Sequence, residues 1–286
     1  MSKKDEDKRP KLSTITGTLQ LYEGSKTERL IQLRDDWSNC SACELGEIRK
    51  IYSTQEVERG APPIDIVFGD GNPDTADILI VGEAPGEEEK EYQVPFVGAS
   101  GELLNQLIAS TTDDEKLKEF YREYNRKSRK SKKEIDSFME TMVEYRRQRF
   151  FITNAVCCQP PENRTPTINE IAQCWDRLWN TIYIIDPILI ITLGSTALAA
   201  VTRRANAKVS KDRGHLFDVK LPGRFGTVVY PVVPIYHPSY LLRKADWKEP
   251  FGDCQKSLSD FRTALSLADK IREQDLGIPI PNRDPY

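Results

Sequence analysis

The sequence predicts a three-layer α/β/α domain built around a central parallel sheet of four strands. Short, mostly apolar runs recur along the chain, and each leads into a loop, which is typical of buried parallel strands. Helical patterns lie between these runs, as expected for a sheet that helices cover on both faces. Because ligands of such sheets bind beyond the carboxyl ends of the strands, we expect the functional residues in the loops that follow the runs.

The predicted elements follow one another in the order strand, loop, helix. The expected strands lie at 77–81, 150–153, 187–192 and 228–234. The expected helices lie at 101–110, 167–182 and 195–202. Upstream of them, the segment from Thr14 to Trp37 predicts one or two short helices, whereas the polar stretch that ends near Pro63 shows no clear periodicity.

The composition changes between Thr111 and Arg149, where Lys, Glu and Arg dominate. We expect a charged helical insertion here, between the first helix and the second strand. Its basic stretch at 126–133 is either a solvated face or a surface for the phosphate backbone of a nucleic acid. The expected organisation is a polar and helical extension over 1–36, one domain over 37–270 that carries the insertion at about 111–149, and a proline-rich tail over 271–286.

The composition bounds the class of protein. Of the 286 residues, 38% are hydrophobic and 30% are charged, and no apolar run approaches the roughly 18 residues needed to cross a bilayer. The charged start of the chain lacks the apolar stretch of a secretory signal, so we expect an intracellular, cytoplasmic monomer with no membrane partner. The formal net charge of −3 creates no overall attraction to nucleic acid, so DNA binding would require a local basic face.

Four of the six cysteines form two separated pairs. Cys40 and Cys43 lie in a C-x2-C turn, and Cys158 is followed after fifteen residues by Cys174 on the next predicted helix. A four-thiolate site needs two local pairs of this kind, because short spacing sets each pair while the fold brings the pairs together. The spacing therefore predicts a metal centre, although unrelated buried thiols remain the alternative.

The residues leave two questions about this centre open. Zinc and a [4Fe–4S] cluster cannot be distinguished by ligand type alone. Cys157 stands next to Cys158, so either thiol could be the ligand, although alternation along a strand would point them to opposite faces. We expect Cys157 and Cys254 to be ordinary thiols.

Several loop motifs occur together in one order. They are VFGDGNP (67–73), GEAPGEEE (82–89), PFVGASGELL (95–104), ITNAVCCQPPENRTPT (152–167), ITLGSTA (191–197) and HPSYLLR (237–243). With the cysteine spacing, these motifs resemble the family 4 uracil-DNA glycosylases from about Cys40 to Arg243, apart from extra residues near 50–65 and the insertion. A related module also occurs in some phage polymerase-associated proteins, so the resemblance predicts the fold better than the activity.

The resemblance implies a function and a cofactor. The implied reaction is hydrolysis of the N-glycosidic bond of flipped-out deoxyuridine in uracil-containing DNA, a step of base excision repair. The four paired cysteines would hold a [4Fe–4S] cluster with a structural role, which favours iron–sulfur over zinc. One alternative is a non-catalytic DNA-binding or replication-associated module that retains the fold and the cluster, and another is a zinc protein of unrelated function.

The resemblance also implies roles for residues of the loops. Ala84, Phe96 and Asn154 would bind the substrate: the Phe96 ring would stack on the uracil and the Asn154 amide would read its Watson–Crick edge. His237 would donate to the uracil O2 as negative charge develops there. Glu83 and Glu89 would stabilise the sugar cation or orient water. Each of these side chains also has an ordinary structural explanation, as a core, cap or surface residue.

The last motif would contact DNA. Ser239, Tyr240, Leu241 and Arg243 would enter the minor groove, with Leu241 or a neighbour as the wedge and Arg243 near phosphate. Two departures follow the motif GEAPGEEE (82–89), because Lys90 and Gln93 stand where the family often has Asp and Gly. We expect these to alter the charge near the sugar and the shape of the loop. The other histidine, His215, matches no catalytic motif.

Overall fold

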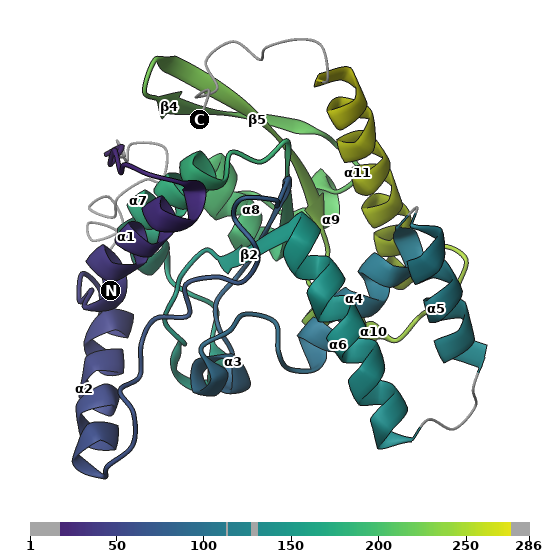
Figure 1. Cartoon of the computed structure of the whole chain (residues 1–286). Helices are drawn as coiled ribbons and strands as arrows, with labels where there is room; N and C mark the ends of the chain where they lie inside the picture. Colours follow the sequence, from purple (N-terminus) through teal and green to yellow (C-terminus); the bar gives the residue numbers. More distant parts are fainter. Residues whose placement is uncertain (1–17, 113, 127–130, 276–286) are drawn as a thin grey trace, which may run out of the picture.

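The computed structural model describes residues 18–112, 114–126 and 131–275 (Figure 1). Within them one sheet of five strands has the spatial order β2-β1-β3-β5-β4. The strands are β1 (Ile78–Gly82), β2 (Phe150–Asn154), β3 (Leu189–Leu193), β4 (Phe217–Gly223) and β5 (Gly226–Ile235). The four predicted strands are β1, β2, β3 and β5, and they pair in parallel.

The predicted count of four strands is wrong because β4 adds an antiparallel edge to the sheet. This strand alternates buried and exposed residues: Val219 and Leu221 are buried, whereas Asp218 and Lys220 face solvent. Only one of its faces is covered, so its sequence lacks the continuous apolar run of a buried parallel strand. It joins β5 through a hairpin whose last pair is Gly223 and Gly226.

Helices surround this sheet. They are α1 (Lys26–Ser38), α2 (Glu44–Glu58), α3 (Glu87–Tyr92), α4 (Ala99–Thr111), α5 (Glu115–Arg126), α6 (Lys132–Arg149), α7 (Ile168–Ile185), α8 (Gly194–Thr202), α9 (Val209–Asp212), α10 (Pro238–Lys244) and α11 (Asp253–Asp275), with a short 3₁₀ turn, η3 (Pro161–Asn163). The three predicted helices correspond to α4, α7 and α8. Helix α2 occupies the stretch in which we expected no periodic structure. No helix in the described ranges is long and apolar enough to cross a membrane.

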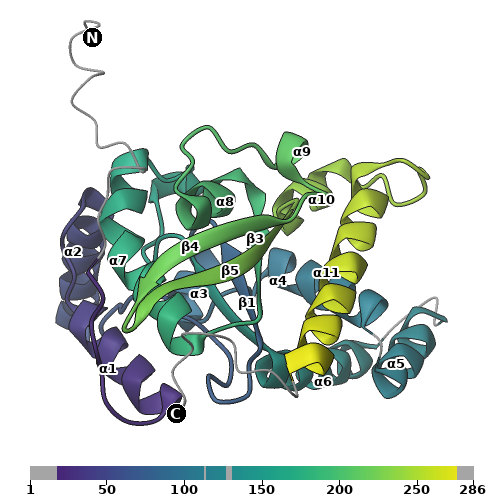
Figure 2. The ribbon, with the colours of Figure 1, turned by 90° about the horizontal axis from the view of Figure 1, so that it is seen from above.

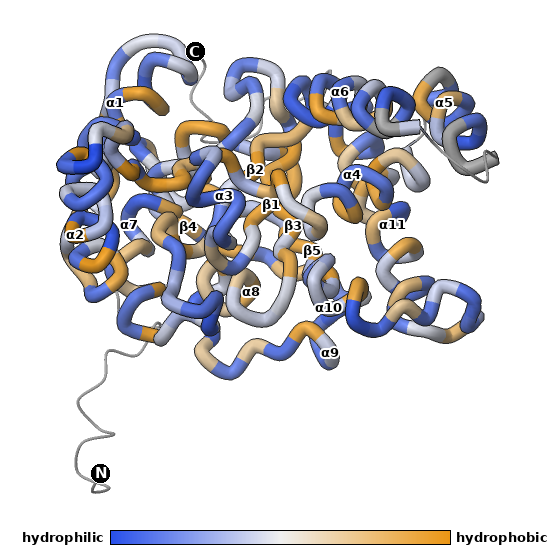
Figure 3. The backbone as a smooth tube through the Cα atoms, turned by 90° about the horizontal axis from the view of Figure 1, so that it is seen from below, coloured by the Kyte–Doolittle hydropathy of each residue, from blue (hydrophilic) through white to orange (hydrophobic). Residues whose placement is uncertain are grey.

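The helices form two layers on opposite faces of the sheet (Figure 2). Successive residues of a strand point to opposite faces, so Leu79 and Val81 pack with α1, α7 and α8. Ile78 and Ile80 pack instead with α4, α6 and α11. The parallel strands β1, β2, β3 and β5 are mostly apolar, as the colouring of Figure 3 shows. The three-layer α/β/α class is confirmed.

The described parts of the insertion are helical, as expected. Helices α5 and α6 pack together through Phe120 and Phe138, whose stacked rings have centroids 5.6 Å apart. Both helices contact α4. Half of the basic stretch, at 127–130, lies outside the described residues, as do the polar start of the chain and the proline-rich end of the tail.

The parallel register brings the site loops to one edge of the sheet. Gly82 pairs with Asn154 at the ends of β1 and β2, and Leu193 pairs with Ile235 at the ends of β3 and β5. All four strands therefore release their following loops at the same edge. This is the edge at which ligands of parallel sheets bind.

Candidate active site

A cavity of about 740 Å³ opens at this edge. The loops after β1, β2, β3 and β5 all contribute to its walls. Of the residues singled out in the sequence, it is lined by Glu83, Ala84, Glu89, Phe96, His237, Ser239, Tyr240 and Arg243. Residues up to 160 positions apart in the chain thus share one cavity, and its mixed polar and apolar wall suits a planar polar ring.

Phe96 is held in a backbone conformation that a bulky residue rarely adopts. Its φ is +58° and its side chain is 3% exposed. A left-handed conformation costs a non-glycine residue roughly 1 kcal/mol, and such costs concentrate at functional sites. Gly101 makes the conformation possible, since a Cβ there would lie 1.7 Å from the carbonyl oxygen of Phe96. The Phe96 ring faces His237, with ring centroids 5.9 Å apart.

A buried arginine supports the same segment. Arg146 donates to Asp70 at 2.7 Å and, over a longer distance of 3.5 Å, to the carbonyl oxygen of Phe96. Asp70 is also bridged through its backbone to Ile152 of β2. The first motif quoted above therefore acts as an anchor: its aspartate orients Arg146, which lies against the Phe96 loop.

Asn154 at the end of β2 is buried with its amide unpaired. The side chain is 1% exposed, and within the described part of the chain neither Nδ2 nor Oδ1 has a hydrogen-bond partner. Leaving a buried polar group unsatisfied costs about 1–3 kcal/mol, so a native protein rarely does so without a reason. A Cβ on Gly82 would lie 2.2 Å from Asn154 Oδ1 and 2.8 Å from the Phe96 ring. The amide therefore lies beside the Phe96 ring, which lines the cavity, although Asn154 itself is not among the lining residues.

His237 has a defined tautomer. The backbone N–H of Ser239 donates to Nδ1 at 3.1 Å, and the Ser239 hydroxyl lies 2.9 Å from the same atom. An imidazole nitrogen that accepts from a backbone N–H carries no hydrogen, so the neutral ring holds its hydrogen on Nε2. Burial, helped by the charge of Arg243, lowers the pKa of His237 to about 4. The ring is thus a neutral donor near pH 7.

The two candidate carboxylates differ in their surroundings. Glu83 accepts a hydrogen bond from the hydroxyl of Thr196 at 2.5 Å. Glu89 is 9% exposed and accepts from the backbone N–H of Gly86 at 3.2 Å, which fixes it at the first turn of α3. Burial raises the pKa of Glu89, while the backbone donors and Arg146 oppose the rise. Both side chains face the cavity as anchored acceptors.

Comparison with known proteins tests whether the chain belongs to the family that its loop motifs resemble. A sequence profile of the uracil DNA glycosylase superfamily matches residues 68–261. The chain belongs to this superfamily. It is 36% identical over 202 residues to the Type-4 uracil-DNA glycosylase of Thermotoga maritima, covering 69% of this chain and 84% of that protein. The resemblance to family 4 is confirmed. The predicted enzyme class, DNA glycosylase, is confirmed at the level of the family.

Two further relatives define the range of this similarity. The Type-4 uracil-DNA glycosylase of Archaeoglobus fulgidus is 29% identical over 226 residues, covering 78% of this chain and 92% of that protein. A DNA polymerase of Bacillus phage SP01 is 31% identical over 176 residues, which is 62% of this chain but 15% of the polymerase. The module thus occurs both as a protein of its own in the superfamily and as part of a much larger polymerase.

The departures at Lys90 and Gln93 lie away from the cavity. Lys90 donates to Glu87 at 2.6 Å, and Glu87 also accepts from Gln159 at 2.7 Å. The lysine charge is therefore paired on the outer side of α3 and does not line the cavity. Gln93 ends α3 with a φ of +55°, a left-handed conformation that glycine adopts more readily, and its amide donates to the carbonyl oxygen of Pro63 at 3.2 Å.

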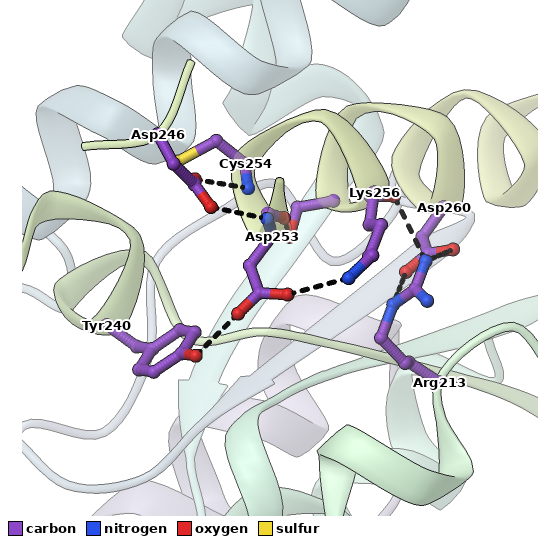
Figure 4. Close-up of polar contacts among 8 residues, drawn as sticks. Arg213, Tyr240, Asp246, Asp253, Cys254, Lys256 and Asp260 are labelled. Carbon is purple, nitrogen blue, oxygen red and sulfur yellow. Dashed lines mark hydrogen bonds and ion pairs between the residues drawn. The ribbon is translucent and has the colours of Figure 1, made fainter. Parts of the chain in front are cut away.

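The predicted DNA-contacting helix, α10, is braced against α11 (Figure 4). The hydroxyl of Tyr240 donates to Asp253 at 2.5 Å, which raises the pKa of Tyr240 to about 12. Asp253 is itself paired with Lys256 at 3.1 Å. Asp246 accepts from the backbone N–H groups of the first residues of α11 and so caps that helix.

The two leucines of α10 differ in exposure, which bears on the expected wedge, Leu241 or a neighbour. Leu241 is fully buried in the core that α4 and α11 share. Leu242 is 44% exposed. Insertion of Leu241 into DNA would require this residue to leave the core, so its exposed neighbour is the better candidate.

The two cysteine pairs lie in one neighbourhood. Cys158 and Cys174 are each 8% exposed, and Cys40 and Cys43 are half-buried. Burial raises the pKa of the Cys158 thiol to about 12, and the neighbouring Cys157 and Cys43 add to the rise. The pKa of Cys43 is likewise raised by burial and by the nearby Cys40, and that of Cys174 by burial, Cys157 and Cys158. The four thiols of the predicted centre are therefore electrostatic neighbours.

The arrangement bears on the kind of centre they could form. Among the described residues, no three His, Cys, Asp or Glu side chains lie close enough to hold a single metal ion. A four-iron cluster holds its thiolates farther apart than one ion does. Four thiols that are mostly removed from solvent are a donor set that both iron–sulfur clusters and zinc sites use.

Some residues of the cavity were not singled out in the sequence. Thr196, which binds Glu83, and Tyr236, whose ring lies 4.9 Å from that of Tyr240, both line it. Arg164 also lines it and is held by two hydrogen bonds, of 2.7 and 2.9 Å, to Glu170 on α7. All three stand in or beside motifs quoted above, so the signal was present but carried no assigned role.

Proposed function

We propose that the protein removes uracil from DNA by hydrolysing the N-glycosidic bond of a flipped-out deoxyuridine. The buried amide of Asn154 beside Phe96 carries this proposal, because neither of its polar atoms has a partner among the described residues and both are free to bind a ligand. The names of the Type-4 relatives support the same reaction. A base that reaches this amide must leave the DNA stack first.

Recognition of uracil follows from the chemistry of the amide. The Oδ1 atom of Asn154 would accept from the uracil N3–H, and Nδ2 would donate to O4. Cytosine presents an acceptor and a donor at the same two positions, so it would meet both amide groups with the wrong polarity. Phe96 would stack on the flipped ring. Selectivity by mispaired buried groups is stronger than selectivity by size.

Bond cleavage separates charge between uracil and the sugar. The reaction passes through an oxocarbenium-like sugar and an anionic base, so the site must stabilise both charges. His237, a neutral donor through Nε2, would stabilise the anion at the uracil O2. Glu83 and Glu89 would stabilise the cation and orient the attacking water. No covalent nucleophile is required.

Contact with DNA would fall to α10. Leu242 is exposed and would fill the gap that the flipped nucleotide leaves. Arg243 at the cavity wall would contact phosphate, with Ser239 and Tyr240 positioned on the same helix. The bond between Tyr240 and Asp253 would keep the helix in place during binding.

The four cysteines Cys40, Cys43, Cys158 and Cys174 would hold a [4Fe–4S] cluster. When bound, the cluster supplies covalent cross-links between the N-terminal helices and the loop after β2, rather than reaction chemistry. Within this chain, the residues it would fix are those of the loop that follows Asn154.

Incubation with a uracil-containing oligonucleotide, followed by hot alkali, tests the reaction. We expect strand cleavage at the uracil and none in a matched thymine oligonucleotide. The polymerase relative favours a second candidate, a replication-associated module that binds DNA without cleaving the glycosidic bond. Absence of cleavage over a range of pH, in protein that retains its iron, would support that candidate instead.

A further inference from the structure

Two buried arginines have no carboxylate partner among the described residues. Three arginines are buried among the described residues: Arg49, Arg146 and Arg177, with 9%, 2% and 1% exposed. Arg146 forms an ion pair with Asp70 at 2.7 Å. Arg49 and Arg177 make no ion pair within the described part of the chain, and the Nε atom of each lacks an acceptor. A buried cation without a counter-charge is costly by several kcal/mol.

The contacts of Arg177 are all to the end of β2. Its guanidinium donates to the hydroxyl of Thr153 at 2.9 Å and to the carbonyl oxygens of Asn154 at 2.5 Å and Ala155 at 3.1 Å. These donors hold the backbone from which the Asn154 amide projects. Of the side chains described, Arg177 is thus the one that fixes this turn by three separate hydrogen bonds.

The same arginine lies beside the cysteines. Cys174 and Arg177 are three residues apart on α7, so they share one face of the helix. The charge of Arg177 lowers the pKa of both Cys157 and Cys174, against the larger effect of burial. Arg177 therefore lies between the thiols on one side and the Asn154 backbone on the other.

Arg49 lies beside the N-terminal cysteine pair, Cys40 and Cys43, much as Arg177 lies beside Cys174. From α2 it donates to the carbonyl oxygens of Ser38 at 2.8 Å and Cys40 at 3.2 Å, and to that of Ile64 at 2.9 Å. Burial raises the pKa of Cys158, and the charge of Arg49 opposes that rise. Arg49 thus shapes the first cysteine loop and brings a positive charge to the thiols, but it makes no contact with Asn154.

We propose that Arg177 is a positioning residue that couples the four-cysteine centre to the uracil-reading amide, and that the negative charge of the thiolates balances Arg177 and Arg49. This inference rests on the proposed function for its second site, the amide of Asn154. Loss of the centre would leave Arg177 as an unpaired buried cation, so the turn at Asn154 would loosen. The centre would thereby act on base recognition without touching the substrate.

The electrostatic half is tested on the intact, iron-loaded protein without any substrate. We would compare Arg177→Met, Arg177→Lys and Arg49→Met with the wild type, and with the exposed Arg262→Met as the control. Removing a nearby cation disfavours the more negative, reduced cluster, so both buried Met variants should have a lower midpoint potential. They should also release iron to a chelator several-fold faster. Arg177→Lys should stay near the wild type, and Arg262→Met should match it.

The positioning half is tested by kinetics on a uracil oligonucleotide. Arg177→Met should lower kcat/KM by about 10- to 100-fold, as expected for a residue that supports a contacting group. Arg49→Met should lose far less activity although its potential moves as much. A purely structural role for Arg177 would predict parallel losses in both variants.

The outcomes separate this inference from the proposed function. If the wild type excises no uracil, the proposed function fails, while the potentials still decide whether the arginines balance the centre. Wild-type potential and iron release in Arg177→Met would overturn the inference even if its activity fell, as would an anaerobic wild-type preparation without iron. If Arg177→Met does not fold, an unchanged potential in Arg49→Met would overturn the charge balance.

Discussion

The backbone N–H of Ser239 donates to Nδ1 of His237 at 3.1 Å, which leaves Nε2 as the hydrogen-bearing atom of the neutral ring. We expect His237→Ala to lower kcat for uracil excision by about 100- to 1,000-fold, since it removes a donor to developing charge. The measurement is single-turnover kinetics, with circular dichroism to verify folding. His215→Ala is the matched control, because His215 is exposed and does not line the cavity. Equal rates for the two variants would contradict the assigned donor.

The lowered pKa of His237 predicts a pH dependence of stability. Between pH 6.5 and about 4, the unfolded chain protonates this histidine while the folded protein does not. The unfolded state therefore binds more protons, and the free energy of unfolding should fall as the pH falls through this window. In His237→Gln this contribution disappears. The free energies of unfolding that urea titrations give at pH 6.5 and pH 4.5 should therefore differ less in this variant than in the wild type. An identical pH dependence in both proteins would contradict the buried neutral ring.

The unpaired amide of Asn154 predicts opposite effects on activity and stability. Asn154→Ala should abolish most excision, yet the free energy of unfolding should not fall and should rise by about 1 kcal/mol, because an unsatisfied buried group is removed. The control is Asn180→Ala, since Asn180 is buried with its amide fully bonded to Thr18, Gln20 and Asp176. That variant should lose about 2 kcal/mol. Equal destabilisation of both variants would refute the interpretation.

The space around two glycines predicts different tolerance of a methyl group. Gly82→Ala would place a Cβ 2.2 Å from Asn154 Oδ1, so the amide must move and kcat/KM should fall by about 100-fold. Gly86→Ala places its Cβ in open space and keeps the backbone N–H of residue 86, which donates a hydrogen bond to Glu89. We expect it to retain activity within about threefold. Steady-state kinetics of both variants on one uracil substrate tests this contrast.

The cysteines divide into proposed ligands and bystanders. Cys158→Ser should lose the brown colour and the iron, because one thiolate of the centre is missing. Cys254→Ser should retain both, since Cys254 is buried at the start of α11, where its thiol contacts the carbonyl oxygen of Leu241. Cys157→Ser tests the neighbouring alternative and should also retain iron. The measurements are iron analysis and visible absorbance of anaerobic preparations. If Cys157→Ser lost iron and Cys158→Ser did not, Cys157 would be the ligand and Cys158 the bystander.

The parallel core of the sheet was predictable because it is buried on both faces. Strands such as β1 and β3 contain only apolar or small residues, and this leaves an unmistakable run in the sequence. The edge strand β4 was missed because one of its faces meets solvent and its side chains alternate. Helix α2 was missed for a related reason: few of its residues are buried, so its periodicity is weak.

The site was predictable as a set of residues but not as an arrangement. Motif order pointed to Phe96, Asn154 and His237, yet the choice of Leu242 over Leu241 depended on which face of α10 meets the core. That face is set by α4 and α11, which are distant in sequence. The partners of Lys90 were equally invisible, because a single charge reveals nothing about its neighbours.

The sequence by itself determined the layered α/β class, the order of the loops that line the site and the family to which the chain belongs. These depend on local apolar runs and on motifs, which remain readable along a chain. Only the tertiary structure decided that Asn154 is buried without a partner, that Phe96 is strained and that Arg177 lacks a carboxylate. Burial and pairing depend on residues brought together from distant segments, so their energetic consequences arise only when the chain has folded.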